Sequence, residues 1–230
     1  MSDFQGIISK LKKLPDRQRN DEVILIDSMN LFIRNFVAVR AMNLEGQHIG
    51  GILGFLRSLG YIIRTNNPTR VICIFDGKGG TSARKNMNPK YKANRNHSKI
   101  LKWEVHDDIA QEKESIIAQI ARIKDYLDVL PVDYIDIEKV EADDVISFLA
   151  QGLAKRNSKV KIISTDKDFL QLVHPNISVH NPVSKKTYTI DNVEDEIKVP
   201  PVNYLIAKAL VGDSSDNLSG IKGLGIKTLV

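Results

Sequence analysis

Three short apolar runs, rich in β-branched residues, constrain the fold of this chain more than any other feature. They are Val23 to Ile26, Val71 to Phe75 and Val160 to Ile163. Nearly continuous apolar character is typical of strands that are covered on both faces, as in parallel sheets. Long helical patterns separate the three runs. Alternating strands and helices predict an α/β fold with three layers, α/β/α, around a central, mostly parallel sheet.

The segments between these runs carry apolar residues at helical spacing. The spacing predicts helices around residues 53–63, 109–127 and 145–153, and a further helix from Tyr204 onward. Val132 to Ile137 predicts an additional strand, and Ile177 to Ile190 predicts a hairpin around Asn181 and Pro182. The chain is expected to be one α/β domain with a small appended module.

Composition excludes some classes of protein and favours others. With 230 residues, 42% of them hydrophobic, the chain can bury the core of a real domain. No apolar stretch approaches the roughly 18 to 20 residues needed to span a membrane. The single cysteine, Cys73, lies in the apolar run VICIF and is expected to be a buried thiol in a reducing cytoplasm. The net charge of +5 is weak evidence for a polyanionic partner.

Aspartates follow each of the three predicted strands. Asp27 and Asp76 come directly after the first two, and Asp166 and Asp168 follow the third. Since the ends of parallel strands line one edge of a sheet, these side chains are expected to meet there. The run VEADD adds Glu141, Asp143 and Asp144 at a helix start. Asp213 and Asp216, three residues apart in GDSSDN, are expected on one face of a helical turn.

Each of these carboxylates also has an ordinary structural explanation. An aspartate after a strand is usually a turn former or a helix N-cap, and acidic residues at a helix start complement the helix dipole. A close cluster, however, is unstable unless protons or cations neutralise it. No histidine or cysteine neighbours these carboxylates at ligand spacing, which argues against zinc. An all-oxygen set favours magnesium or manganese, and nine carboxylates suffice for two ions.

A basic segment begins directly after Asp76. It contains no acidic residue between Gly77 and Lys99. A charge run is usually a solvated face, but a phosphate backbone lying between this segment and the acidic edge would satisfy both. Tyr91 adds a ring on which a base could stack. The basic residues of the segment are Lys78, Arg84, Lys85, Lys90, Lys92, Arg95 and Lys99.

Closely spaced glycines near the end of the sequence form a second candidate for phosphate binding. Such glycines let successive backbone N–H groups hold a phosphate at a helix start. The same pattern is also compatible with a tight interhelical turn. The residues concerned are Gly220, Lys222, Gly223, Gly225 and Lys227.

Taken together, the motifs resemble those of the 5′-nuclease family, which includes flap endonucleases, the 5′-nuclease domain of bacterial DNA polymerase I and phage 5′-exonucleases. Within this family, the motif sequences and the short length most resemble the phage branch, which is of the phage ribonuclease H type. The matching pieces occur in the family's order between residues 23 and 228: VILIDSMNLFIR, FDGKGG, PKYKANR, VEADD, ISTDKDF, AKALVGDSSDN and GIKGLGIKT.

The resemblance implies roles for particular residues. Tyr91, Lys92 and Arg95 match the helical arch that encloses the single-stranded 5′ end, and Arg34 and Lys208 match basic active-site residues. The glycines match a helix–hairpin–helix element that grips duplex DNA and in relatives often holds a potassium ion. The residues matching the family's metal-site carboxylates are Asp27, Asp76, Glu141, Asp143, Asp144, Asp166, Asp168, Asp213 and Asp216.

The resemblance also implies an organisation and an activity. It divides the chain into an amphipathic segment (1–20), a 5′-nuclease domain (21–200) with a basic arch at about 77–110, and a helix–hairpin–helix element (201–230) that looks truncated. The implied activity is two-metal hydrolysis, with Mg²⁺ or Mn²⁺, of DNA and RNA–DNA near 5′ ends and flaps. The expected setting is primer removal in replication by a cytoplasmic monomer, beside single-strand-binding or other replication proteins.

Two other functional classes compete with this interpretation. A DNA-binding module without catalysis would use the basic segment and the glycine hairpin, but an intact set of carboxylates argues against it. Other acidic-site phosphoryl enzymes fit less well. A haloacid-dehalogenase-type phosphatase needs an aspartate where Met29 stands, and a topoisomerase–primase-type domain needs a glutamate where Asp27 stands.

Overall fold

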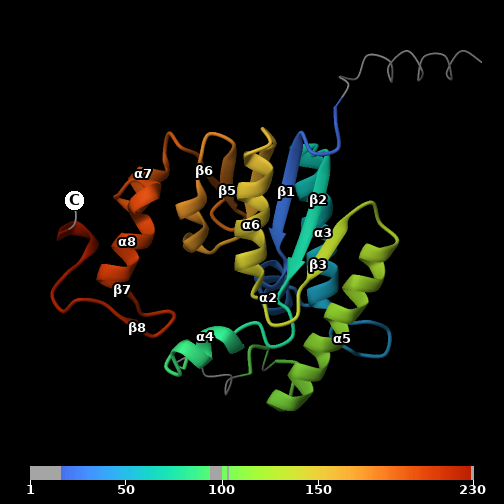
Figure 1. Ribbon diagram of the computed structural model, residues 1–230. Helices are drawn as coiled ribbons and strands as arrows, with labels where there is room; N and C mark the ends of the chain where they lie inside the picture. Colours follow the sequence, from blue (N-terminus) through green and yellow to red (C-terminus); the bar gives the residue numbers. More distant parts are fainter. Residues whose placement is uncertain (1–16, 94–99, 103, 229–230) are drawn as a thin grey trace, which may run out of the picture.

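A central sheet organises the molecule. The computed structural model describes residues 17–93, 100–102 and 104–228 (Figure 1). The sheet has the strand order β3-β2-β1-β4-β5-β6. Strands β1 to β5 pair in parallel and β6 pairs antiparallel to β5, so the predicted sheet and hairpin are confirmed. The strands are β1 (Glu22–Asp27), β2 (Arg70–Phe75), β3 (Asp133–Asp136), β4 (Lys159–Ile163), β5 (Ile177–Asn181) and β6 (Lys186–Tyr188).

Helices cover both faces of the sheet and confirm the three-layer α/β/α architecture. Buried side chains of α2 (Ser28–Ala38), α3 (Gly50–Asn66) and α5 (Ile109–Asp128) form the core on one face. The other face is covered by α6 (Ala142–Ala154), the 3-10 helix η1 (Lys167–Leu172), α7 (Val193–Ile197) and α8 (Pro201–Val211). The short helix α4 (Ser82–Met87) lies beyond the end of the sheet (Figure 1).

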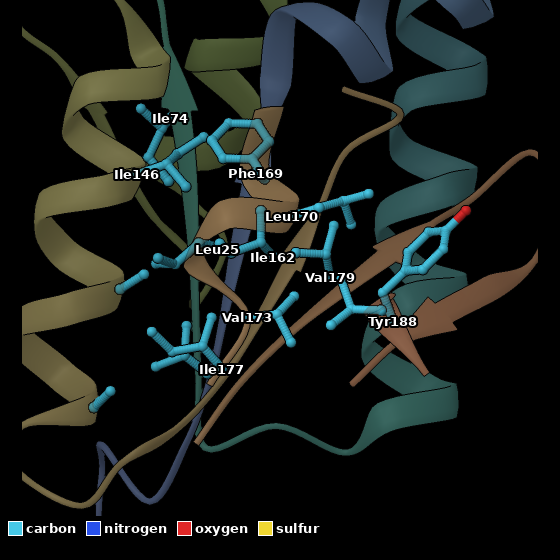
Figure 2. Packing of buried hydrophobic residues seen from close by; sticks show 14 of the residues in the cluster. Leu25, Ile74, Ile146, Ile162, Phe169, Leu170, Val173, Ile177, Val179 and Tyr188 are labelled. Carbon is cyan, nitrogen blue, oxygen red and sulfur yellow. The ribbon is translucent and has the colours of Figure 1, made fainter. Parts of the chain in front are cut away.

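The central strands are apolar throughout because both of their faces are buried. In β1, Leu25 points into the core beneath α6, and Ile26 points into the core beneath α2 and α3. Figure 2 shows the α6 side, where Leu25 and Ile162 pack with Ile146 and Phe169. On the opposite face Cys73 is fully buried, as predicted. Burial of these side chains supplies the main stabilisation of the domain.

The strand directions decide where a site can form. Strands β1 and β2 both run toward the end of the sheet where α4 lies (Figure 1). At that end β1 passes straight into α2, a helix that the apolar spacing did not predict. Asp27 is the N-cap of α2, and its side chain accepts a hydrogen bond from the backbone N–H of Asn30 at 3.1 Å. This cap holds the carboxylate at the strand end.

The remaining elements are short. A two-stranded hairpin, β7 (Gly212–Asp213) and β8 (Leu218–Ser219), follows α8, and the 3-10 helix η2 spans Ile226–Thr228. Most of the predicted amphipathic segment at 1–20 lies outside the described residues. Among the helices that the structure describes, none has the length and apolar character required to cross a bilayer.

Candidate metal centre and nucleic-acid interface

Carboxylates from three strand ends meet at the edge of the sheet, as predicted. Asp27 is the last residue of β1, Asp76 follows β2, and Asp166 lies just beyond β4. All three line one open pocket of about 600 Å³. The sheet order explains this convergence, because β1 lies between β2 and β4. The three aspartates come from neighbouring strands although they lie far apart in the sequence.

The N-terminus of α6 brings two more acidic side chains, Glu141 and Asp143, into the same pocket. Asp76 fixes this approach, since its carboxylate accepts a hydrogen bond from the backbone N–H of Ala142 at 2.8 Å. Asp76 therefore links the end of β2 to the start of α6. We call Asp27, Asp76, Glu141, Asp143 and Asp166 the first carboxylate group.

Two glycines of the FDGKGG motif allow the loop after β2 to lie against the segment that leads into α6. A Cβ atom on Gly77 would lie 1.7 Å from the carbonyl oxygen of Ile137, and one on Gly80 would lie 2.9 Å from that of Val140. The backbone N–H of Gly77 also donates to the Val140 carbonyl at 3.1 Å. A side chain at Gly77 would therefore push the two parts of the first carboxylate group apart.

Burial and mutual repulsion make Asp27 and Asp143 reluctant to ionise. Burial raises the pKa of Asp27 to about 6, and the nearby charges of Asp76 and Asp166 act in the same direction. Burial likewise raises the pKa of Asp143 to about 7, with further contributions from Asp27, Asp166 and Asp76. Cations bound among these oxygens would favour the charged forms.

The metal-free protein is expected to be more stable near pH 5 than near pH 8. Between about pH 4 and pH 7 the folded state holds protons on Asp27 and Asp143 that the unfolded chain has released. This stabilisation is complete below about pH 4 and is lost as the pH rises through 6 and 7. The expected loss is on the order of a few kcal/mol. Urea unfolding of chelator-treated protein across this range measures it.

Burial lowers the pKa of His48 and His180, which opposes the effect below about pH 6.5. Other carboxyls do not mask it. Salt-bridged Glu196 and Asp213 have pKa values lowered to about 2, so they stay ionised throughout the range. Magnesium added at the alkaline end should restore the lost stability, because it favours the deprotonated carboxylates. Unfolding free energy that stays level or increases from pH 5 to pH 8 without metal would contradict the proposed burial of these charges.

A second carboxylate group lies beside the first. It consists of Asp168, Asp213 and Asp216, whose carboxylate oxygens all lie within 4.8 Å of one another. These residues share a second pocket with Glu141 and Asp143, so the two groups adjoin.

The predicted helical turn that would carry Asp213 and Asp216 is wrong. The two residues belong to the β7–β8 hairpin and its turn. The Asp213 carboxylate accepts from the backbone N–H and the hydroxyl of Ser215, at 2.9 and 2.6 Å. This local bonding offers the backbone an alternative to a helix. The hairpin nevertheless brings both carboxylates to the same place.

Lys208 of α8 neutralises part of the second carboxylate group. Its ammonium group contacts Asp168 and donates to Asp213 at 2.6 Å. Although burial acts to raise the pKa of Asp213, the bonds from Lys208 and Ser215 outweigh it and lower this pKa to about 2. Lys208 therefore lies at the second carboxylate group, and the pocket of the first group does not include it.

Cationic side chains from the segment after β2 converge on buried Glu141. Arg84 and Lys92 reach its carboxylate at 2.9 and 3.2 Å, and the hydroxyl of Tyr91 donates to it at 3.3 Å. Arg84 also pairs with Asp144 at 2.7 Å. The basic segment thus faces the acidic edge, as predicted. Tyr91 itself is 7% exposed, so little of its ring surface is available in this structure for the predicted stacking of a base.

Backbone contacts tie the same basic segment to the second carboxylate group. The N–H of Lys92 donates to the carbonyl oxygen of Asp216 at 2.9 Å, and the side chain of Asn217 donates to the carbonyl oxygen of Lys90 at 2.9 Å. Lys92 adopts a left-handed backbone conformation with φ of 54°. A lysine rarely occupies this region, so the surrounding contacts hold it there.

Comparison with known proteins identifies the family. A family model described as 5′-3′ exonuclease, N-terminal resolvase-like domain, matches residues 22–198. This chain belongs to the 5′-3′ exonuclease family. A 5′-3′ exonuclease of Aquifex aeolicus is 32% identical over 207 residues, covering 90% of this chain and 66% of that protein. The DNA polymerase I of Borreliella burgdorferi is 33% identical over 212 residues, covering 90% of this chain and 22% of the polymerase.

Solved structures support the same fold. The bacteriophage T5 5′-exonuclease, in a structure with divalent zinc ions, superposes with a TM-score of 0.74 at 19% identity. The match covers 90% of this chain and 72% of the T5 chain. The catalytic core of Rad2 in complex with DNA substrate gives a TM-score of 0.55 at 20% identity. This chain therefore has the fold of the 5′-nucleases and spans part of the length of its relatives.

Two of the other predicted basic residues of this family member lie at the first carboxylate group. Arg34 and Lys85 line the first pocket, and the guanidinium group of Arg34 donates to the hydroxyl of Thr165 at 3.3 Å. Lys78 and Lys90 are exposed. Arg95 and Lys99 lie outside the described residues.

The predicted helix–hairpin–helix element is described only in part. Helix α8 is present, Gly220 and Lys222 are exposed, and Gly223 has a positive φ of 84°. Gly225 directly precedes η2 and Lys227 lies within it, at the limit of the described residues. After Gly220, the described residues, which end at Thr228, include only the 3-10 helix η2 and no second long helix. The element therefore stays a prediction.

The donor chemistry of the pockets fits hard divalent ions. Among the described residues, no histidine or cysteine lines either pocket, and the side chains that face them together offer carboxylate oxygens. Oxygen-rich sites of this kind suit magnesium and manganese.

Sequence reasoning missed several polar residues that hold the acidic edge together. The side-chain oxygen of Asn30 accepts from the hydroxyl of Thr165 at 2.9 Å, which joins α2 to the end of β4. Ser164 bonds to Asp27 at 2.9 Å. Asn30 lies three residues after Asp27, at a position where a helix start faces the edge of the sheet. That spacing was the available signal.

Proposed function

We propose that this chain is a divalent-metal-dependent, structure-specific 5′ nuclease. It hydrolyses DNA, and RNA annealed to DNA, near 5′ ends and flap junctions by a two-metal mechanism. The observation that carries this proposal is the convergence of carboxylates from β1, β2, β4 and α6 in one open pocket, faced by Lys92 and Arg34. Membership of the 5′-3′ exonuclease family supports the reaction class.

The residues of the chain have distinct roles in this proposal. The two carboxylate groups bind magnesium, or manganese in its place, and such ions activate a water molecule and stabilise the leaving oxygen of a phosphodiester. Lys92, with Arg34 and Arg95, offsets charge on the scissile phosphate. Lys208 orients Asp168 and Asp213. The exposed lysines of the basic segment bind the phosphate backbone, as do Gly220, Lys222, Gly223, Gly225 and Lys227.

The organisation follows the same assignment. Residues 21–200 form the nuclease domain, the arch at about 77–110 receives the single-stranded 5′ end, and residues 201–230 contact duplex DNA with a potassium ion at the glycines. The relatives that are DNA polymerases I support a role in removing primers during replication, in the cytoplasm of a bacterial or phage-infected cell. The protein would act as a monomer, without a membrane, together with single-strand-binding or other replication proteins.

Magnesium should switch on cleavage of a fluorescent 5′-flap substrate, and a chelator should abolish it. The expected products carry a 5′-phosphate and map near the flap junction. Lowering the pH below about 7 should raise the magnesium concentration that is needed, because protonated Asp143 and Asp27 bind metal poorly. Gel analysis of matched flap, nicked and blunt duplexes measures both position and preference.

A result of binding without cleavage would favour the competing hypothesis of a DNA-binding module. In that case affinity for the flap substrate would be retained with chelator, and magnesium would leave the DNA intact at every concentration tested. Equal cleavage of all three substrates would contradict the structure-specific part of the proposal while leaving metal dependence in place.

A further inference from the structure

Ser164 lies at the first carboxylate group, where it contacts Asp27 and Asp166. It is the residue directly after β4 and is 2% exposed. Its backbone N–H donates to the carbonyl oxygen of His180 on β5 at 3.2 Å, so the main chain is fixed by the sheet. The side chain is therefore a buried hydroxyl at the acidic edge, and buried hydroxyls require partners.

The hydroxyl of Ser164 connects two aspartates from different strands. It donates to one carboxylate oxygen of Asp27 at 2.9 Å and accepts from the backbone N–H of Asp166 at 3.0 Å. The other oxygen of Asp27 accepts from the backbone N–H of Asn30 at 3.1 Å. Hydrogen bonds therefore orient both carboxylate oxygens of Asp27, and Ser164 supplies one of these two bonds.

The connection continues into the second carboxylate group. The side chain of Asp166 accepts from the backbone N–H of Asp168 at 2.8 Å. One continuous chain of hydrogen bonds therefore links Asp27, Ser164, Asp166 and Asp168. A hydroxyl suits the second place in this chain because it donates and accepts at once, which neither a methyl group nor a carboxylate does.

We propose that Ser164 is a positioning residue that sets the affinity of the first carboxylate group for divalent ions. Like-charged oxygens crowded into one pocket repel one another unless they are held, and an ion binds tightly where its ligands are already in place. Groups that orient metal ligands typically change metal affinity by about 10- to 100-fold when they are removed. The inference rests on the proposed metal-dependent function.

Titration of Mn²⁺ into the DNA-free full chain tests the proposal. Ser164→Ala is expected to weaken Mn²⁺ binding by about 10- to 100-fold. Cleavage should fall at low metal and recover largely at high metal, so the metal concentration for half-maximal rate moves more than the maximal rate. The matched control is Ser178→Ala on the neighbouring strand, whose hydroxyl contacts the carbonyl oxygen of Val160 at 3.5 Å and no carboxylate. It should bind Mn²⁺ like the wild type.

The outcomes separate this inference from the proposed function. Folded Ser164→Ala with wild-type Mn²⁺ affinity overturns the positioning role alone. If circular dichroism shows that Ser164→Ala does not fold, Ser164→Cys decides, since its thiol fills the space but donates weakly. Wild-type affinity in that variant likewise overturns the role. A wild-type chain that binds no Mn²⁺ overturns both the proposed function and the inference.

Discussion

Asp166→Asn is expected to abolish cleavage while DNA binding stays measurable. The substitution keeps the shape of the side chain and removes one negative charge from the first carboxylate group. Removing a residue that merely orients a metal ligand lowers metal affinity or activity by up to about 100-fold. Loss of a ligand itself should lower the activity by more than that. Single-turnover cleavage of a 5′-flap substrate at saturating magnesium measures the loss. Asp76→Asn should behave in the same way.

The stability of the metal-free protein should increase in the Asp166→Asn variant, although its activity is lost. Asp166 contributes to raising the pKa of Asp27 and of Asp143, so its neutralisation relieves repulsion in the metal-free protein. The Asp166→Asn variant should therefore melt at a higher temperature without metal and gain less from added magnesium. Asp191→Asn, an exposed aspartate outside both groups, is the matched control. Retained cleavage in both Asp166→Asn and Asp76→Asn would refute the site assignment.

Lys92→Ala should lower turnover far more than it lowers affinity for duplex DNA. Lys92 lines the first pocket and its ammonium group lies at 3.2 Å from Glu141, within the acidic edge. Removing a group that stabilises transition-state charge typically costs about 10²- to 10³-fold in turnover. Single-turnover rates on the flap substrate, together with equilibrium binding in calcium, separate the two effects.

Lys90→Ala offers a contrast two residues away. Lys90 is exposed and its side chain is not in the first pocket, so this substitution should mainly weaken binding and reduce its salt dependence. A similar loss of turnover and affinity in Lys92→Ala would count against a role in catalysis and in favour of simple phosphate binding.

The sequence was informative where side-chain chemistry and strand ends coincide. Apolar runs buried on both faces revealed β1, β2 and β4, and parallel pairing made the meeting of Asp27, Asp76 and Asp166 predictable. Residue type alone could not reveal Ser164, because serine is common at strand ends. Its importance depends on the register of β1 with β4, where Ile26 pairs with Ile163.

Other features depended on local hydrogen bonds and packing that a sequence pattern does not reveal. The Asp213 carboxylate bonds to Ser215 and stabilises a hairpin turn where the three-residue spacing predicted a helix. The sequence offered Tyr91 as a ring on which a base could stack, but it did not reveal that the Tyr91 hydroxyl donates to buried Glu141. Lys208 matched an active-site lysine, but which carboxylates it contacts is set by how α8 packs beside η1.

The position of β1 between β2 and β4 has a consequence for how activity arises during synthesis. Asp27 and its hydrogen-bond partner Ser164 are 137 residues apart in the chain. A growing chain makes β1 early but completes the sheet on its second side only after β4 has left the ribosome. Non-local pairing of this kind is slow and cooperative. We therefore expect nascent chains to remain inert toward nucleic acid until the fold is nearly complete.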